Sequence, residues 1–166
     1  MSDILINQPL LEEPRLEALP IKHLCDLQVD LETPLIIPTP RGALIPYIGK
    51  GGRLEGPRLR GEFLPDSVDW VLIGSDGISR LDIRGAIRTD DGALIYFESK
   101  GVAKLPPDGR KRLSKGERVG FGETYLPTTP KTETSDERYT WLNEHVLVGY
   151  NAMSTGRVDF RIYQVL

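Results

Sequence analysis

The sequence has few of the residues that form disulfides and metal sites. Its 166 residues include one cysteine, Cys25, and two histidines, His23 and His145. A lone cysteine cannot form an internal disulfide and is typical of a reducing compartment, so a cytoplasmic location is expected. The one cysteine and two histidines are too few and too scattered to be the ligands of an ordinary zinc site. We therefore expect no metal and no other cofactor.

An excess of basic charge and long apolar runs are missing too. The net charge is −3, whereas binding to a phosphate backbone calls for a concentrated basic surface. No apolar run approaches the ~20 residues that cross a membrane. The first residues lack the basic region and apolar stretch of a secretory signal. Neither a nucleic acid nor a membrane is expected as a partner.

Glycine and proline, by contrast, are plentiful, with 17 and 13 residues spread along the chain. This distribution divides the chain into many short segments, as all-β folds require. From Lys22 onward, apolar and polar residues alternate with a period of two. His23, Cys25 and Leu27 fall on one face, so the alternation predicts a half-buried strand with His23 pointing inward.

Turn residues separate the further strands that the pattern predicts. Asp76-Gly77 is a dipeptide favoured in hairpins, and another turn is expected at Asp90-Asp91-Gly92. The segments between such turns alternate and follow one another as a meander. One short helix is expected within residues 110–115, and a second from Thr134 through Tyr139.

These segments predict an all-β protein. A meander of about eight or nine strands usually closes, because closure removes the exposed edges of the sheet. We predict a single antiparallel closed β-barrel of the lipocalin or calycin kind, with one or two short helices. The barrel spans residues 21–166 and follows an N-terminal arm at residues 1–20. A β-sandwich is the alternative.

A series of different short motifs follows a fixed order along most of the chain. The first group is Arg41-Gly42, Ile45-Pro46, Gly51-Gly52, Gly56-Pro57, Leu59, Gly61, Leu64-Pro65 and Asp69-Trp70. The second is Leu81-Asp82, the run from Arg88 to Tyr96, Thr129-Pro130, Glu133-Thr134, Tyr139, Trp141-Leu142-Asn143 and Val148-Gly149. Over roughly residues 20–166 the chain resembles domain-of-unknown-function family 3237.

The resemblance implies a lipocalin-like barrel and, for most members, no established activity. Some fungal relatives are associated with ring closure of the chalcone-isomerase type, an acid–base reaction that needs no cofactor. The chain departs from the family pattern at Pro127, where Arg is common, and at Thr132, where Phe is common. We therefore expect an altered pocket wall and carry over no single member's substrate.

Three residues are candidates for catalysis. Asp82 and Arg88 share one face of a predicted strand at residues 80–88 and belong to the family pattern. Either this face is the solvated outside of the barrel, or both residues point inward as a charge pair that serves a ligand. His23 is the predicted proton-transfer group, because histidine titrates near neutral pH and the family's opening strand often carries one. The alternative for His23 is a structural place in the core or at the rim.

Seven residues are candidates for contact with a ligand. Aromatic rings can stack on an aromatic molecule, although the two tryptophans are more simply core fillers. Among the polar candidates, Asn143 also suits a turn, and Arg41 could either bind an anionic group or be solvated. The candidates are Arg41, Trp70, Tyr96, Tyr125, Trp141, Asn143 and His145.

These residues support two main functional hypotheses. The first is a cofactor-independent acid–base enzyme, an isomerase, cyclase or lyase, that acts on a hydrophobic or aromatic small molecule in a hollow barrel. The alternative is a non-catalytic barrel that carries or sequesters such a molecule. A third reading is a structural module whose barrel is filled by its own side chains. We favour the enzyme and leave open whether the chain forms a homo-oligomer.

Overall fold

The structure, a computed structural model, describes residues 14–166, so residues 1–13 of the predicted arm lie outside the described part. It contains ten strands, one α-helix and one 3-10 helix. The strands are β1 (Ile21–Leu31), β2 (Ile37–Thr39), β3 (Gly42–Glu55), β4 (Arg60–Phe63), β5 (Val68–Ile73), β6 (Ser79–Thr89), β7 (Leu94–Ala103), β8 (Pro127–Glu133), β9 (Leu147–Ser154) and β10 (Arg157–Val165). The helices are α1 (Gly109–Ser114) and the 3-10 helix η1 (Thr140–Glu144).

The strands form one antiparallel sheet that closes on itself, because β1 pairs with both β10 and β3. β1 and β2 pair with different parts of β3, while β4 and β5 pair with different parts of β3 and β6. Each of these two pairs of strands occupies one position in the wall, which leaves eight positions around the barrel. The predicted all-β, closed antiparallel barrel is confirmed.

β6 shows how the alternating sequence sets the two faces of the wall. Leu81, Ile83 and Ile87 point into the barrel, and the three arginines that alternate with them, Arg80, Arg84 and Arg88, point to solvent. Turns at Gly77 and Gly92 connect β6 to its neighbours. Their φ angles of 75° and 91° lie in the left-handed region that favours glycine. Both turn predictions are confirmed.

The two predicted helices have different outcomes. α1 agrees with the helix expected within residues 110–115. The second expectation is wrong in position, since residues 134–136 are irregular, residues 137–139 form a turn and η1 begins only at Thr140. Thr134 Oγ1 donates to the carbonyl oxygen of Leu94 at 2.8 Å, which ties this segment to β7 instead of starting a helix. No helix within residues 14–166 has the length and apolar character to cross a membrane.

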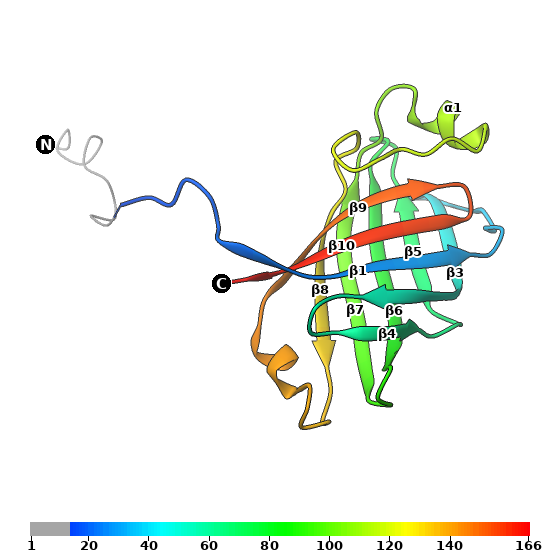
Figure 1. Cartoon of the computed structure of the whole chain (residues 1–166). Helices are drawn as coiled ribbons and strands as arrows, with labels where there is room; N and C mark the ends of the chain where they lie inside the picture. Colours follow the sequence, from blue (N-terminus) through cyan, green and yellow to red (C-terminus); the bar gives the residue numbers. More distant parts are fainter. Residues whose placement is uncertain (1–13) are drawn as a thin grey trace, which may run out of the picture.

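The two ends of the barrel differ, and Figure 1 shows α1 at one end and η1, in orange, at the other. The end beside η1 is filled by core residues such as Leu54, Ile95 and Leu142, each no more than 1% exposed. The end beside α1 contains open space, described below. The fold therefore consists of a packed half and a hollow half.

Candidate functional site

The hollow half of the barrel contains a cavity of about 570 Å³, a size typical of small-molecule sites. Its wall includes Phe160, together with Phe63 and Phe97, whose rings meet edge to face with centroids 5.3 Å apart. The mouth is bounded by the loop after β1, the segment around α1 and the turn between β9 and β10. The chain thus has the hollow barrel that the sequence predicted.

Asp69 places a carboxyl group in the wall of this cavity. It lies on β5 opposite Tyr47 of β3, and both side chains line the cavity. Asp69 Oδ1 accepts the backbone N–H of Asp82 at 3.0 Å. Register pairs between β5 and β6 stop at Asp69 and resume at Leu72, so the carboxylate replaces a backbone acceptor in the ladder. One carboxylate oxygen is therefore fixed, and the other makes no hydrogen bond within the part of the chain that the structure describes.

The surroundings of Asp69 shift its acidity. Burial raises the pKa of its carboxyl group from 3.8 to about 7, the Asp82 N–H opposes this rise, and the Asp82 carboxylate adds to it. Burial likewise raises the pKa of Tyr47, as does the nearby Asp69, while the positive charge of Arg110 lowers it. Arg110 belongs to α1 and lines the cavity mouth. Tyr47 is therefore close enough to both Asp69 and Arg110 for each charge to affect its hydroxyl group.

His23 lies on the outside of the barrel, and the predicted inward orientation is wrong. The register of β1 against β10 shifts between His23 and Cys25, so Leu24 and Cys25 are both buried. This bulge rotates His23 outward, where its side chain is 41% exposed and its Nε2 lies 3.0 Å from Asp26 Oδ1. A catalytic role for His23 stays a prediction, but its side chain does not line the cavity.

Asp82 and Arg88 also face outward, so the idea of an inward charge pair is wrong. Asp82 lies 3.6 Å from the Arg84 guanidinium and 3.7 Å from the Lys100 ammonium group. Arg88 pairs instead with Glu62 of β4 at 2.9 Å. Because charged residues on β6 alternate with apolar ones that fill the barrel, this face is the solvated outside that the alternative reading described. Asp82 still serves the cavity through its backbone N–H.

The ligand-contact candidates on strands and loops lie outside the cavity as well. Trp70 is 46% exposed on the outer face of β5, and Arg41 is exposed at the turn between β2 and β3. Tyr96 donates its hydroxyl hydrogen to Glu98 at 2.8 Å on the outer face of β7. Tyr125 is 63% exposed. The orientations of Trp70 and Tyr96 follow from the alternation along β5 and β7, and ligand contact by all four residues stays a prediction.

The remaining three candidates belong to η1 and the residue after it, at the packed end. Trp141 packs against the core, with the Arg58 guanidinium 3.7 Å from the ring centroid. Asn143 satisfies a turn, since it accepts the Thr134 N–H at 3.0 Å and donates to the Thr134 carbonyl oxygen at 2.8 Å. His145 Nδ1 lies 2.6 Å from the Trp141 carbonyl oxygen. None of the sequence-predicted site residues lines the cavity within residues 14–166.

Two residues of the cavity, Asp69 and Tyr47, were missed at the sequence level. The signal for Asp69 was present, because it belongs to the Asp69-Trp70 motif and alternates with Val71 and Ile73 on the inner face of β5. Tyr47 had a weaker signal in a mostly apolar run. An acidic residue within an apolar alternation is the pattern that marks a carboxyl group inside a barrel.

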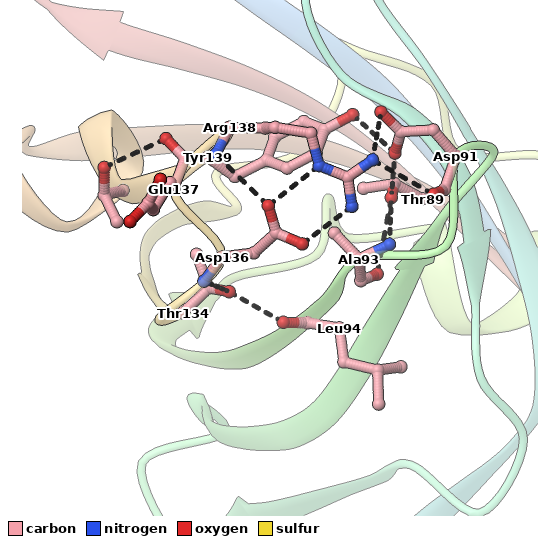
Figure 2. Close-up of polar contacts among 10 residues, drawn as sticks. Thr89, Asp91, Ala93, Leu94, Thr134, Asp136, Glu137, Arg138 and Tyr139 are labelled. Carbon is pink, nitrogen blue, oxygen red and sulfur yellow. Dashed lines mark hydrogen bonds and ion pairs between the residues drawn. The ribbon is translucent and has the colours of Figure 1, made fainter.

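A polar cluster fastens the packed end (Figure 2). Arg138 donates to both carboxylate oxygens of Asp136, at 2.9 and 2.7 Å, and to the carbonyl oxygen of Asp91 at 3.1 Å. The hydroxyl groups of Tyr139 and Thr89 donate to Asp91 Oδ1 at 2.9 and 2.6 Å. These contacts join the β6–β7 turn to the segment before η1. We call the cluster the end clamp: Thr89, Asp91, Thr134, Asp136, Arg138 and Tyr139.

No three His, Cys, Asp or Glu side chains gather as metal ligands would among residues 14–166. The lone cysteine, Cys25, is buried in the core, and burial raises the pKa of its thiol to about 12. Such a thiol stays protonated and is a poor nucleophile at neutral pH. Among the described residues, the groups best placed for chemistry inside the barrel are Asp69 and Tyr47.

Solved structures share this architecture. A protein of unknown function from Rhodopseudomonas palustris superposes with a TM-score of 0.84 at 28% identity, covering 91% of this chain and all of that one. A β-barrel-like protein from Acinetobacter baumannii gives a TM-score of 0.77 at 30% identity, covering 94% of this chain and all of that one. An enzyme from Penicillium herquei gives 0.67 at 19% identity over 93% and 99% of the two chains, a likeness of fold alone.

Relatives in sequence carry the name of an uncharacterised family. The UPF0311 protein of Rhodopseudomonas palustris is 33% identical over 123 residues, which cover 74% of this chain and 79% of that protein. A UPF0311 protein of Bradyrhizobium diazoefficiens is 35% identical over the same shares of both chains. The family described as Protein of unknown function (DUF3237) matches residues 19–165, and the chain belongs to this family.

Proposed function

We propose that the protein is a cofactor-independent acid–base enzyme that acts on a hydrophobic or aromatic small molecule inside the barrel. The observation that carries the proposal is Asp69, a carboxyl group in the wall of an apolar cavity with a pKa raised to about 7. A group with a pKa near the working pH is an efficient proton acceptor and donor. The reaction is an isomerisation, a cyclisation or an elimination, each of which needs acid–base groups but no cofactor; in an elimination the removed proton passes to the departing leaving group.

The geometry gives each group one task. Asp69 Oδ1 is held by the Asp82 N–H, which leaves the other oxygen to remove a proton from the substrate. The Tyr47 hydroxyl donates a hydrogen bond to the substrate oxygen on which negative charge develops. Asp69 then returns its proton to the product in an isomerisation or cyclisation, so the proton count closes without a cofactor.

The alternative is a barrel that carries a hydrophobic molecule without changing it. The apolar wall of the cavity favours this alternative equally, because binding needs no titratable group. The buried carboxyl favours the enzyme, since an ionisable group in an apolar site is costly to keep unless it serves a purpose. The fold also supports an enzyme in Penicillium herquei, which is an analogy of fold and not of site.

Substitution of Asp69 separates the two functions. Asp69→Asn keeps an oxygen that can accept the Asp82 N–H but cannot take up a proton. Suitable probes are 2′-hydroxychalcone, whose ring closure is followed by absorbance, and 1-tetralone, whose exchange of the α-proton for deuterium is followed by NMR. For a probe reaction that the wild-type protein accelerates, we expect Asp69→Asn to lower the rate by roughly 10²–10⁴-fold with little change in binding of the probe. Trp70→Phe, on the outer face of the same strand, should leave that rate unchanged.

The proposal fails if Asp69→Asn keeps the wild-type rate. Tight binding of both compounds by the wild-type protein, with no acceleration of either reaction, would favour the carrier. A cytoplasmic location is part of the proposal and rests on the single cysteine of the sequence. Fractionation of cells that express the untagged protein tests the location.

A further inference from the structure

The cavity wall carries few charged side chains, and all of them except Asp69 lie near the mouth. Two arginines line the cavity, Arg110 of α1 and Arg157 of β10. Arg157 is neutralised by Asp30, with Nε 2.8 Å from Oδ1. Arg110 makes no ion pair and no side-chain hydrogen bond to any of residues 14–166. Its guanidinium is therefore the uncompensated positive group of the described cavity wall.

The neighbours of Arg110 fix the position of its helix. Arg112, two residues further along α1, donates to Glu123 at 2.9 Å and to the Arg118 carbonyl oxygen at 2.6 Å. The Thr155 hydroxyl, from the β9–β10 turn, donates to the Leu113 carbonyl oxygen. These contacts attach α1 to the rim of the barrel. The backbone of Arg110 is thus held at the mouth, and its exposed side chain is near enough to Tyr47 to affect its titration.

Two acidic side chains also line the cavity, one at the mouth and one inside the barrel. Glu32 follows β1 on an exposed loop of the mouth, and Asp69 is mostly buried within the barrel. The remaining wall is dominated by apolar side chains, among them Phe63, Phe97 and Phe160. A ligand that fits this arrangement has an apolar body for the barrel and one negative group for the mouth.

We infer that the ligand is an amphipathic organic anion, with a ring-bearing apolar body beside Asp69 and its anionic group bound by Arg110. This inference rests on the proposed function for one point, namely that the apolar end of the ligand is the end that reacts. A guanidinium presents two parallel N–H groups to a carboxylate, which supplies both affinity and orientation. Binding of the anion at the mouth directs the apolar end, where the proton is transferred, toward Asp69 and Tyr47.

Binding of matched probes tests the inference without any turnover. 2-Naphthoate and the neutral 2-naphthamide have the same ring system and differ in charge. At pH 6, where Asp69 is largely protonated, we expect the wild-type protein to bind 2-naphthoate about tenfold more tightly than 2-naphthamide. Arg110→Gln should remove this difference by weakening naphthoate binding alone, and Lys111→Gln, the same change of charge on the same helix, should preserve it.

Each outcome has a distinct meaning. Equal affinities in the wild-type protein, a preference that survives Arg110→Gln, or no saturable binding of 2-naphthoate would overturn the inference. Asp69→Asn should keep the preference for the anion while it loses turnover. If the preference stands and Asp69 proves irrelevant to any reaction, the proposed function fails and the chain is a carrier of organic anions.

Discussion

The packed end and the hollow end of the barrel are made of the same alternating strands but are stabilised in different ways. At the packed end, buried apolar side chains fill the barrel and the hydrogen bonds of the end clamp join its turns. At the hollow end, a mostly apolar wall surrounds open space and holds a buried carboxyl that has one hydrogen bond. The packed end therefore has most of the features that stabilise a fold, and the hollow end has the features on which the proposed function rests. Substitutions at the two ends should therefore have separable effects.

The largest expected effect is a change of the free energy of unfolding with pH, caused by Asp69 at the hollow end. The folded protein holds the Asp69 proton up to about pH 7, whereas the unfolded chain releases it near the ordinary pKa of 3.8. The folded state therefore binds more protons between these values, so this group's stabilisation is present below about pH 4 and is lost as the pH rises to about 7. At roughly 1.4 kcal/mol per pKa unit, the loss is about 4 kcal/mol.

Asp69→Asn removes this titration. The difference in free energy of unfolding between the variant and the wild-type protein should shift in favour of the variant by about 4 kcal/mol from pH 4 to pH 8. Urea unfolding across this range measures the shift, and other carboxyl groups cancel in the difference. Parallel pH profiles for the two proteins would contradict the prediction.

The next effect concerns the packed end. Leu142→Ala removes a buried side chain of η1 and leaves a cavity in the core, which should lower the free energy of unfolding by about 3 kcal/mol. The affinity for 2-naphthoate should stay within about twofold if the ends are separable. Leu94→Ala is the matched control, because Leu94 lies at the same end but is 58% exposed. Chemical denaturation and probe titration measure both properties, and a joint loss of stability and affinity would show that the ends are coupled.

A smaller effect is expected within the end clamp. Thr89 Oγ1 accepts the buried N–H of Ala93 at 2.7 Å and donates to Asp91 at 2.6 Å. Thr89→Val keeps the shape but leaves the Ala93 N–H without an acceptor, which should cost about 2 kcal/mol. Thr89→Ser keeps the hydroxyl and should cost less. Equal losses in the two variants would mean that the methyl group, and not the hydrogen bond, stabilises this turn.

The smallest effect is expected on the outer surface. His23→Ala and Arg88→Gln alter exposed side chains away from both the core and the cavity, so each should change the free energy of unfolding by about 0.5 kcal/mol or less. Neither should change probe affinity or the rate of a reaction that depends on Asp69. A large loss of turnover in His23→Ala would instead restore the catalytic role that the sequence suggested.

The fold was largely predictable because its signals are local. Alternation defined the faces of β6, and Asp76-Gly77 and Asp90-Asp91-Gly92 marked its turns. The orientation of His23 was not predictable, because the bulge before Cys25 exists only through the pairing of β1 with β10. A one-residue shift exchanges the faces of a strand, so a local pattern cannot reveal which side chain ends up outside.

The site was harder to predict because the recognisable motifs concentrate at the packed end. Thr89, Asp91, Tyr139 and Asn143 belong to those motifs and secure turns there. Asp82 belongs to them too, yet its contribution to the cavity is a backbone N–H, which no side-chain pattern reports. Ile45 and Leu81 of the motifs also line the cavity, but within residues 14–166 Asp69 is their polar side chain there, and its partner, the Asp82 N–H, is invisible in the sequence.

The blocked end of the barrel has a kinetic consequence. Within residues 14–166 the core and the end clamp fill the side opposite α1, so the cavity communicates with solvent at the mouth. Substrate and product of an enzyme with this shape share one passage and one binding volume. The product must leave before the next substrate molecule enters, so the product competes directly with the substrate and turnover should slow as product accumulates.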